Sequence, residues 1–359
     1  MKKAFLIFSL ILILGTLSCG TKTPPTDPEV APATETTQAP ESALVPTQES
    51  ETVSQPELQG TVLPQTVSVP SGLRVVYIRD GNLWSWTEAG GKAQLTGTGD
   101  MSTARVSNDG QLLAFMRGRE VWTVGMDGMH ARLLSTQAGE GGALWFSSDA
   151  SLVAVSTKDH IDVVDVMAAT SVTVTTYPAL PDGYYPEVVW SPDALGFKTV
   201  IPSQLETGQA ELLFVFTSGT VASLAKFTMI PLSESSPYIS PDGGYIIYVA
   251  KLGEGNESLY LMDSSGATKP YGQPAENVCA YGWLPDAKHF AYGEQDLPNA
   301  FLGKVGGPPT GITIVFPAEV HWVDAERFLA LDDGALMLGD LSGNIVPIDS
   351  AVQDFDFVP

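Results

Sequence analysis

A short pattern of apolar and polar positions recurs along most of the chain. Each copy has an aromatic or aliphatic anchor residue, then usually Ser, then a turn that contains Asp. The copies are Val106-Ser107-Asn108-Asp109-Gly110, Phe146-Ser147-Ser148-Asp149, Trp190-Ser191-Pro192-Asp193, Ile239-Ser240-Pro241-Asp242-Gly243, Trp283-Leu284-Pro285-Asp286 and the shorter Trp322-Val323-Asp324. Their anchors are 40, 44, 49, 44 and 39 residues apart, a spacing typical of the blades of a β-propeller.

Apolar runs of strand length follow these turns. β-Branched and aromatic residues favour strands, whereas Asp, Asn, Gly and Pro suit the turns between them. The first runs are Leu112–Met116, Leu152–Ser156, Tyr245–Ala250, His289–Tyr292 and Arg327–Leu331. The second runs are Val121–Val124, Ile161–Val164, Leu212–Phe216, Leu259–Met262 and Leu336–Leu338. With the strand that enters the motif and one more beyond a glycine turn, each repeat is expected to hold four strands.

The two ends of this region predict a seventh blade. Leu73–Ile78, Asn82–Thr87 and Ala93–Thr96 are expected to be the second, third and fourth strands of a blade that lacks its first strand. Val352–Pro359 is a first strand without the other three. Pairing these parts would close the ring and remove exposed sheet edges. The predicted fold class is therefore all-β, a seven-bladed β-propeller over residues 73–359 closed by its N- and C-terminal strands.

The turn motif resembles that of Trp-Asp-repeat-like β-propellers of the TolB type, in which blades carry a Trp-Ser-Pro-Asp-Gly turn. Trp190–Asp193 and Ile239–Gly243 match it best, whereas Asp149, Asp193 and Asp286 are followed by Ala instead of Gly. Residues 20–72 cannot form the N-terminal α/β domain that TolB itself carries. In layout the chain also resembles lipid-anchored propellers that serve as scaffolds in envelope protein assembly.

The N-terminus predicts export and lipidation. The apolar run Ala4–Leu17 is shorter than the roughly 20 residues of a membrane-spanning helix and has the length of a secretory signal. Ser18-Cys19-Gly20 then resembles the lipobox of bacterial lipoproteins, although Thr16 stands where that family usually has Leu. The resemblance implies a signal peptide over residues 1–19 and a lipid such as palmitate on Cys19. The alternative is ordinary cleavage that leaves Cys19 unmodified.

Residues 20–72 differ in composition from the rest of the chain. They are rich in Thr, Pro, Glu, Ser and Gln, and no Phe, Tyr or Trp occurs between Phe8 and Tyr77. Without large apolar groups, nothing offsets the entropy lost on ordering such a segment. We expect a disordered linker that holds the propeller away from a membrane.

The charge of the chain narrows the range of partners. It has 18 basic and 41 acidic residues and a net charge of −23, and residues 73–359 alone carry 15 basic and 34 acidic residues. This excess of acid argues against nucleic acid and favours a basic or cation-bridged partner. Two cysteines are too few for a disulfide framework, a Cys-based zinc site or an iron–sulfur cluster. Cys279, in an apolar run, is expected to be buried.

Histidines are the first candidates for catalysis or metal binding. No nucleophile elbow, P-loop, zinc-protease or EF-hand motif accompanies them. The repeat makes Trp322, beside His321, a structural anchor, and Asp324 its turn residue. His289 is expected at a blade rim, and a metal held by two histidines of adjacent blades is the alternative. The other two are His130 and His160.

Paired carboxylates are the second candidates. Asp332-Asp333-Gly334 is typical of a hairpin turn. Asp354 and Asp356 alternate with Phe355, so both acids share one face of the closing strand, either in the channel or between sheets. Oxygen ligands suit Ca²⁺, so a channel cation is the alternative to a structural role for this pair.

Aromatic residues complete the candidates. Trp84, Trp86, Trp122, Trp145, Tyr184 and Tyr185 are expected to pack within the sheets. The alternative concerns Tyr184 and Tyr185, which lie in the loop 178–186. This loop and the longer excursion Pro202–Gln209 could decorate one face, where exposed aromatic residues would be typical binding hot spots.

The predicted function is a non-enzymatic, monomeric lipoprotein whose propeller binds a protein or ligand outside the cytoplasmic membrane. No catalytic residue, cofactor or metal is assigned, and nucleic acid is not an expected partner. The alternative is a propeller hydrolase or lyase with a carboxylate or His site at the central channel. A redox or cofactor-dependent propeller is the third hypothesis.

Overall fold

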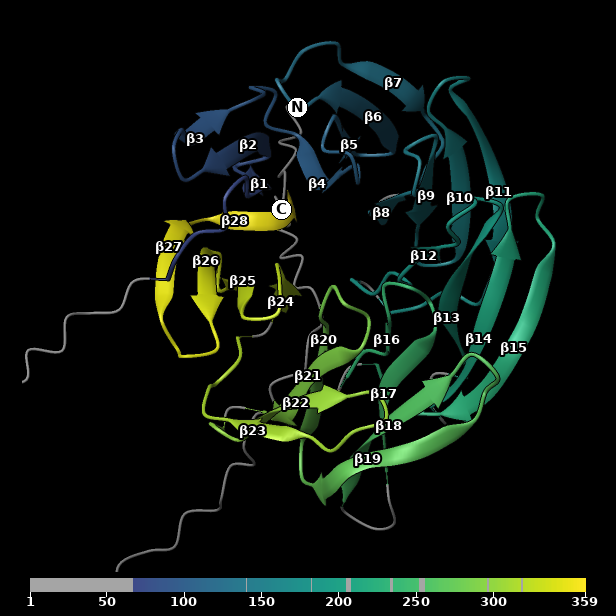
Figure 1. Ribbon diagram of the computed structural model, residues 1–359. Coiled ribbons are helices and arrows are strands. Elements are labelled where there is room, and N and C mark those ends of the chain that lie inside the picture. Colours follow the sequence, from purple (N-terminus) through teal and green to yellow (C-terminus); the bar gives the residue numbers. More distant parts are fainter. Residues whose placement is uncertain are drawn as a thin grey trace, which may run out of the picture. The chain divides into compact units, whose positions relative to one another are not determined.

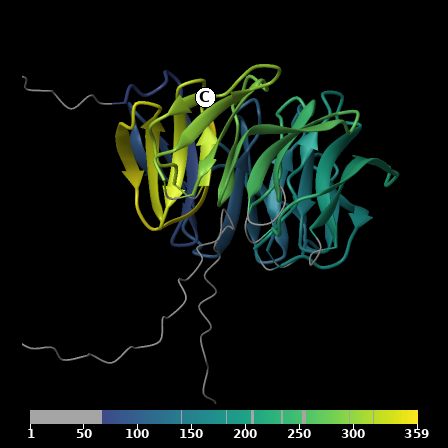
Figure 2. The same cartoon turned by 90° about the horizontal axis from the view of Figure 1, so that it is seen from below.

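The computed structural model describes residues 67–139, 141–181, 183–204, 208–232, 235–251, 256–295, 297–317 and 319–359. The regular secondary structure of these segments consists of β-strands alone, and the strands form seven four-stranded antiparallel sheets. The sheets stand as blades around a central axis (Figure 1) and form a disc when seen from the side (Figure 2). This confirms the predicted seven-bladed propeller.

Each blade runs from an inner strand beside the axis to an outer strand at the rim. The inner strands are β28 (Val352–Val358), β4 (Met101–Val106), β8 (Ala143–Phe146), β12 (Val189–Trp190), β16 (Tyr238–Ile239), β20 (Val278–Trp283) and β24 (Glu319–Trp322). The second strands are β1 (Arg74–Arg79), β5 (Leu112–Arg117), β9 (Leu152–Ser156), β13 (Gly196–Gln204), β17 (Tyr245–Lys251), β21 (His289–Glu294) and β25 (Arg327–Asp332).

The two outer layers follow in the same order. The third strands are β2 (Asn82–Thr87), β6 (Glu120–Gly125), β10 (His160–Asp165), β14 (Gln209–Phe216), β18 (Glu257–Asp263), β22 (Ala300–Lys304) and β26 (Ala335–Asp340). The outer strands are β3 (Gly91–Gln94), β7 (Arg132–Ser135), β11 (Thr170–Thr176), β15 (Val221–Thr228), β19 (Thr268–Ala275), β23 (Thr310–Ile312) and β27 (Ile345–Asp349). Blade 1 is β28-β1-β2-β3, and blades 2 to 7 are formed by consecutive strands.

One expected element differs from the structure. The strand expected at Ala93–Thr96 is β3, which begins at Gly91, because Gly91 takes a φ of 65° and closes the turn earlier. The excursion expected at Pro202–Gln209 is partly in strands, since Pro202 pairs with Ala210 and β13 and β14 extend into it, while residues 205–207 lie outside the described residues.

The recurring turn owes its shape to its Ser and Asp side chains. In blade 2, the Ser107 hydroxyl donates to Asp109 Oδ1 at 2.6 Å, and Gln111 N donates to the same oxygen at 3.1 Å. The same Ser–Asp contact recurs at 147/149, 191/193 and 240/242. The residue after Asp is left-handed, with φ near 67° at Gly110 and 57° at Ala150. The degenerate repeats thus keep the turn and place an unfavourable residue in it.

Ala150→Gly and Ala194→Gly together are expected to stabilise the propeller. Both alanines are left-handed, with φ of 57° and 54°. Such a conformation costs about 1–2 kcal/mol for a residue with a Cβ, and the greater freedom of unfolded glycine returns part of that gain. The double variant should gain about 1 kcal/mol in urea unfolding. Gly243→Ala, at the equivalent position with φ of 68°, is the reverse control and should destabilise. A lower midpoint for the double variant would contradict this account.

Hydrophobic clusters join each blade to the next. The described residues contain seven main clusters, one at each of the seven interfaces between blades. Three motif tryptophans add a hydrogen bond across the interface. The indole Nε1 of Trp190, Trp283 and Trp322 donates to a main-chain carbonyl oxygen of the preceding inner strand at 3.0–3.2 Å. The anchors therefore fix the inner strands relative to one another.

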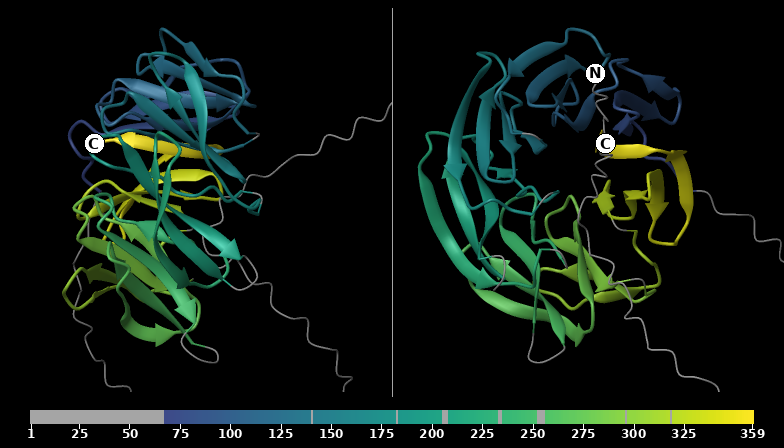
Figure 3. Two further views of the ribbon diagram at one scale, coloured as in Figure 1. Left: turned by 90° about the vertical axis from the view of Figure 1, so that its right-hand side faces the viewer. Right: turned by 180° about the vertical axis from the view of Figure 1, so that it is seen from behind.

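The ring is closed as expected, by β28 pairing with β1 (Figure 3). Phe355, opposite Tyr77, is fully buried in the cluster between blades 7 and 1. Asp349 of blade 7 accepts hydrogen bonds from Tyr77 at 2.8 Å and Lys92 at 2.7 Å, both in blade 1. Burial opposes the charge of Asp349, but these donors outweigh it and lower its pKa to about 2. Ionic and apolar contacts together seal this interface.

The N-terminal expectations lie largely outside the described residues. These are the signal peptide, Cys19 and residues 20–66. Residues 67–72 are described, and Val67 is buried in the cluster between blades 7 and 1. No helix in the described part of the chain is apolar and long enough to traverse a bilayer.

Candidate functional site at the channel mouth

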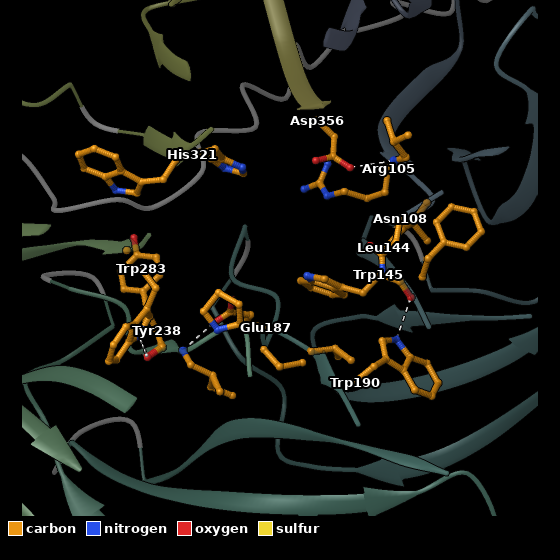
Figure 4. Close-up of a pocket in the computed structure, with 18 of the residues that line it drawn as sticks. Arg105, Asn108, Leu144, Trp145, Glu187, Trp190, Tyr238, Trp283, His321 and Asp356 are labelled. Atoms are coloured by element: carbon orange, nitrogen blue, oxygen red, sulfur yellow. Dashed lines mark hydrogen bonds between the residues drawn. The ribbon is translucent and has the colours of Figure 1, made fainter. Parts of the chain in front are cut away.

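The residue just before each of the six anchors faces the central channel, as does Asp356, which precedes Phe357, the residue that takes the anchor's place in the closing strand. These seven residues, here called the channel ring, line one cavity of about 460 Å³. The channel ring is Arg105, Trp145, Val189, Tyr238, Gly282, His321 and Asp356. Turn residues Asn108, Ser148 and Pro241 also border the cavity, so it opens on the face that carries the motif turns (Figure 4).

The channel ring is chemically varied where the anchors are uniform. Every anchor is apolar and packs between blades, as the repeated fold requires. The channel ring instead holds a cation, an acid, a histidine, two aromatic residues, valine and glycine. Seven equivalent backbone positions are thus occupied by seven different residue types around one space. An arrangement of this kind is suited to recognising an asymmetric ligand.

One side of the cavity is an ionic group formed by blades 1 and 2. The Arg105 guanidinium donates to both oxygens of Asp354 at 2.8 and 3.0 Å and to the carbonyl of Ala104 at 2.6 Å. Asp356 accepts from the main-chain N–H of Val106 at 2.8 Å. Burial raises the pKa of Asp356, and the nearby charge of Arg105 opposes that shift. The two acids of the closing strand therefore share one face, as expected.

The contacts of Asp354 argue against the alternative of a Ca²⁺ ion bound by Asp354 and Asp356 in the channel. The oxygens of Asp354 face Thr103 Oγ1 at 2.9 Å, Ala104 N at 2.8 Å and Arg105. Protein donors thus fill the positions that Ca²⁺ would need around this carboxylate. Among the described residues, no group of three or more His, Cys, Asp or Glu side chains is arranged to hold a metal.

Glu187 approaches the cavity from the opposite side. It lies two residues before β12 and accepts a hydrogen bond from Ile239 N in the neighbouring blade at 3.0 Å. Inner strands are edge strands, so such carboxylates satisfy N–H groups that would otherwise lack a partner. Burial raises the pKa of Glu187 to about 7, against the opposing effects of the Ile239 N–H and of His321.

His321, in β24, lines the same cavity and lies across from Asp356 (Figure 4). Its Nε2 is 3.1 Å from Glu319 Oε1, and its ring packs on Phe355 with centroids 4.6 Å apart. Burial would lower the pKa of His321, but the hydrogen bond and charge of Glu319 outweigh it, and the pKa is raised. The structural roles expected of its neighbours are confirmed, since Trp322 is buried and Asp324 accepts from Arg327 N at 2.9 Å.

The other histidines are not among the residues that line the cavity. His289 begins β21 at the motif turn, as the expected rim position implies, with Nδ1 2.6 Å from Asp286. His160 contacts Asp159 and Asp162 in blade 3. His130 is exposed in a turn with a φ of 62°. The two adjacent-blade histidines, His289 and His321, thus each pair with a different carboxylate.

Two further expectations concern loops. Asp332-Asp333-Gly334 forms the hairpin between β25 and β26, as predicted, with left-handed φ at Asp333 and Gly334. Tyr184 takes the packing role expected of it, and not the alternative role of an exposed hot spot. Tyr184 is 7% exposed and belongs to the cluster between blades 4 and 5, while Tyr185 is half-buried. Cys279 is buried in β20, as expected.

Sequence reasoning missed Arg105 and Glu187 and assigned Trp145 to sheet packing alone. Trp145 instead projects into the cavity (Figure 4). The signal was present in the repeat. Position −1 from each anchor gives the channel ring, and position −3 gives Glu187, Glu319 and Asp354. Because side chains alternate along a strand, positions −1 and −3 share a face.

Comparison with known proteins identifies a class of fold. No protein-family model matches the chain, and no curated protein is detectably similar to it in sequence. A functionally unknown protein from Desulfotomaculum acetoxidans is similar in structure, with 9% identity, a TM-score of 0.56 and coverage of 80% of this chain and 98% of the other. A putative 6-phosphogluconolactonase from Bacteroides fragilis shows 12% identity, a TM-score of 0.52 and coverage of 80% and 98%.

TolB from Acinetobacter baumannii is also among the similar structures, with 14% identity and a TM-score of 0.47. The match covers 80% of this chain and 66% of the TolB chain. At these identities the similarity extends to the fold alone. The chain is a seven-bladed β-propeller of the kind that the motif turns predicted.

Proposed function

We propose that the protein is a non-enzymatic binding scaffold of the cell envelope, anchored through a lipid on Cys19, that recognises a partner or ligand at the channel mouth. The observation that carries this proposal is the channel ring, in which seven equivalent positions hold seven different residue types around one cavity. The envelope location and the anchor rest on the signal sequence and on Ser18-Cys19-Gly20.

Binding is favoured over catalysis because the ionic groups are already engaged. Arg105 is held by Asp354 and by a carbonyl oxygen, and Asp356 and Glu187 each accept a main-chain N–H. These bonds position the groups rigidly, as a recognition surface requires. The chemical variety of the mouth would provide specificity, and the linker would set the reach of the propeller.

Photo-crosslinking at the mouth tests the binding role. A photoreactive amino acid replaces Asn108 or Ser148, both exposed beside the cavity, in the full chain in cells. Val172, 56% exposed on the outer strand β11, provides the control position. We expect one shared adduct from the two mouth positions and none from the control. Adducts from Val172 alone, or none from the mouth, would refute the assignment of the mouth as the binding face.

Intact mass of the mature chain tests the anchor. Acylation of Cys19 adds the mass of the lipid to a chain that begins at this residue, and Cys19→Ala should abolish the added mass and release the protein from membranes. A mature protein with an unmodified Cys19 thiol contradicts the anchor.

Catalysis at the same cavity is the second candidate function. It is favoured by one observation: Glu187, with a pKa of about 7, and His321, whose Nε2 contacts Glu319, line the same cavity, as a general acid and base would. Turnover of lactone or ester substrates by the wild type that is lost in both Glu187→Gln and His321→Gln would favour an enzyme.

A further inference from the structure

Two carboxylates line the cavity, Asp356 and Glu187, and each accepts a hydrogen bond from a main-chain N–H. They differ in the basic group that acts on them. The permanent charge of Arg105 acts on Asp356, whereas the charge that acts on Glu187 is that of His321, which can lose its proton. In the described part of the chain, no basic side chain forms a salt bridge with Glu187, so this carboxylate lacks a permanent countercharge, which a ligand could supply.

The walls beside Glu187 are aromatic. Trp145 projects from β8 into the cavity, between the Arg105–Asp356 side and Glu187, and Tyr238 borders the same space (Figure 4). The face of an aromatic ring carries partial negative charge and attracts ammonium and guanidinium groups. A carboxylate beside such a face is a suitable environment for an organic cation.

An anion is poorly suited to the same cavity. Its permanent cation, Arg105, already donates to Asp354 and to the carbonyl oxygen of Ala104. Asp356 and Glu319 add negative charge close to this guanidinium. Three acids, Asp354, Asp356 and Glu319, thus surround the one permanent cation among the described residues that line the cavity, within a chain whose net charge is −23.

We propose that the channel cavity binds an organic cation, whose ammonium or guanidinium group pairs with Glu187 and whose carbon chain packs on Trp145. This inference rests on the binding role proposed above and gives the chemistry of the ligand. The cavity, at about 460 Å³, has room for a short diamine or for one Lys or Arg side chain of a partner protein. Either source presents the same group to the same carboxylate.

The affinity should depend on pH in a defined direction. The pKa of Glu187 is raised to about 7 by burial, so its charge is present above pH 7 and is lost as the pH falls. The titratable groups that act on it are His321, Tyr184 and Tyr238. Since the pKa of His321 is also raised, its protonation at lower pH adds a repelling charge. Both changes weaken cation binding below pH 7, while the tyrosines stay neutral.

Titration calorimetry on the full chain in detergent tests the proposal with cadaverine as the probe, at pH 8 and physiological salt. 1,5-Pentanediol is the uncharged comparison and should not bind. We expect Glu187→Gln to weaken cadaverine binding at least about tenfold, because the amide keeps an acceptor for Ile239 N but loses the charge. Trp145→Leu should weaken it severalfold, and the wild type should bind about tenfold more weakly at pH 6 than at pH 8.

Matched controls separate the cavity from the general negative charge of the protein. Glu88→Gln removes one exposed acid after β2 and should leave the affinity unchanged. Tryptophan fluorescence on heating checks that each variant is folded. A second set of titrations uses Nα-acetyl-lysine amide, whose side-chain ammonium is free, and a short Arg peptide. Tighter binding of these probes than of cadaverine identifies a partner side chain as the source, and the reverse order identifies a free amine.

Two results would overturn the proposal: no binding of any of these cations at 10 mM, or equal affinity in the wild type and Glu187→Gln. Crosslinking from Asn108 shows whether a negative result overturns the organic cation alone or also the channel mouth as the binding face. If the mouth still forms its adduct while no cation binds, the cation is wrong and the binding face stands. If both fail, the channel mouth is not the site.

Discussion

Removal of residues 352–359 is expected to abolish cooperative folding of the propeller. These residues form β28, the inner strand of blade 1, which pairs with β1 from Arg74 to Arg79. Without β28, β1 becomes an open edge and the clusters on both sides of blade 1 lose their cover. We expect the truncated chain to aggregate and to give no single unfolding transition in urea followed by tryptophan fluorescence.

A rearranged chain provides the control for this truncation. The same eight residues are placed before Leu73 and joined to it by Asp-Gly, which with Val358-Pro359 completes the motif turn, so that blade 1 resembles the other six. This variant should regain a cooperative transition near the wild-type midpoint. Phe355→Ala is the milder test and should cost about 3–5 kcal/mol, since the ring is fully buried. A truncated chain that unfolds like the wild type would show that closure by β28 is dispensable.

Asp354→Ala is expected to have the second largest effect. The carboxylate is 8% exposed and accepts hydrogen bonds from Arg105, Thr103 and Ala104 across the interface between blades 1 and 2. Its removal leaves a partly buried guanidinium and two buried donors without this acceptor. Breaking a buried pair in this way costs about 3–5 kcal/mol. In a domain of this size, the melting temperature should fall by about 10 °C.

An exposed Arg–Asp pair in the same blade is the matched control. Arg117 donates to Asp100 at 2.7 Å, but the two side chains are 29% and 47% exposed. Asp100→Ala should therefore cost less than about 1 kcal/mol. Asp354→Asn should fall between the two, because it keeps an acceptor and loses the charge. Equal losses for Asp354→Ala and Asp100→Ala would contradict the role given to burial.

The architecture could be predicted because the signal is repeated. One Ser–Asp turn is weak evidence, but six at a blade-length spacing fix the phase of every strand around them. The closing strand followed from the same phase, since Val352–Pro359 fits the place before a turn. Boundaries that depend on a single glycine, such as the start of β3 at Gly91, could not be found in this way.

The candidate site was harder to predict because the repeat draws attention to the conserved chemistry of its turns. Trp322 was correctly assigned as an anchor, but that assignment gave no reason to place the neighbouring His321 in the cavity. Tyr184 packs in the cluster between blades 4 and 5, but its place in a loop left the alternative of an exposed binding residue open. Choosing between the two depends on tertiary contacts that local sequence does not contain.

The origin of β28 at the end of the chain has a consequence for biosynthesis. Tyr77 is synthesised early, and it cannot pair until Phe355, its partner in the sheet, has been synthesised 278 residues later. At about 5–20 residues per second, that delay is roughly 15–55 s. During this time blade 1 is incomplete and its apolar surface is open to other chains. A nascent chain of this protein should therefore need a chaperone, or a translocation channel that keeps it extended, until its last eight residues have been made.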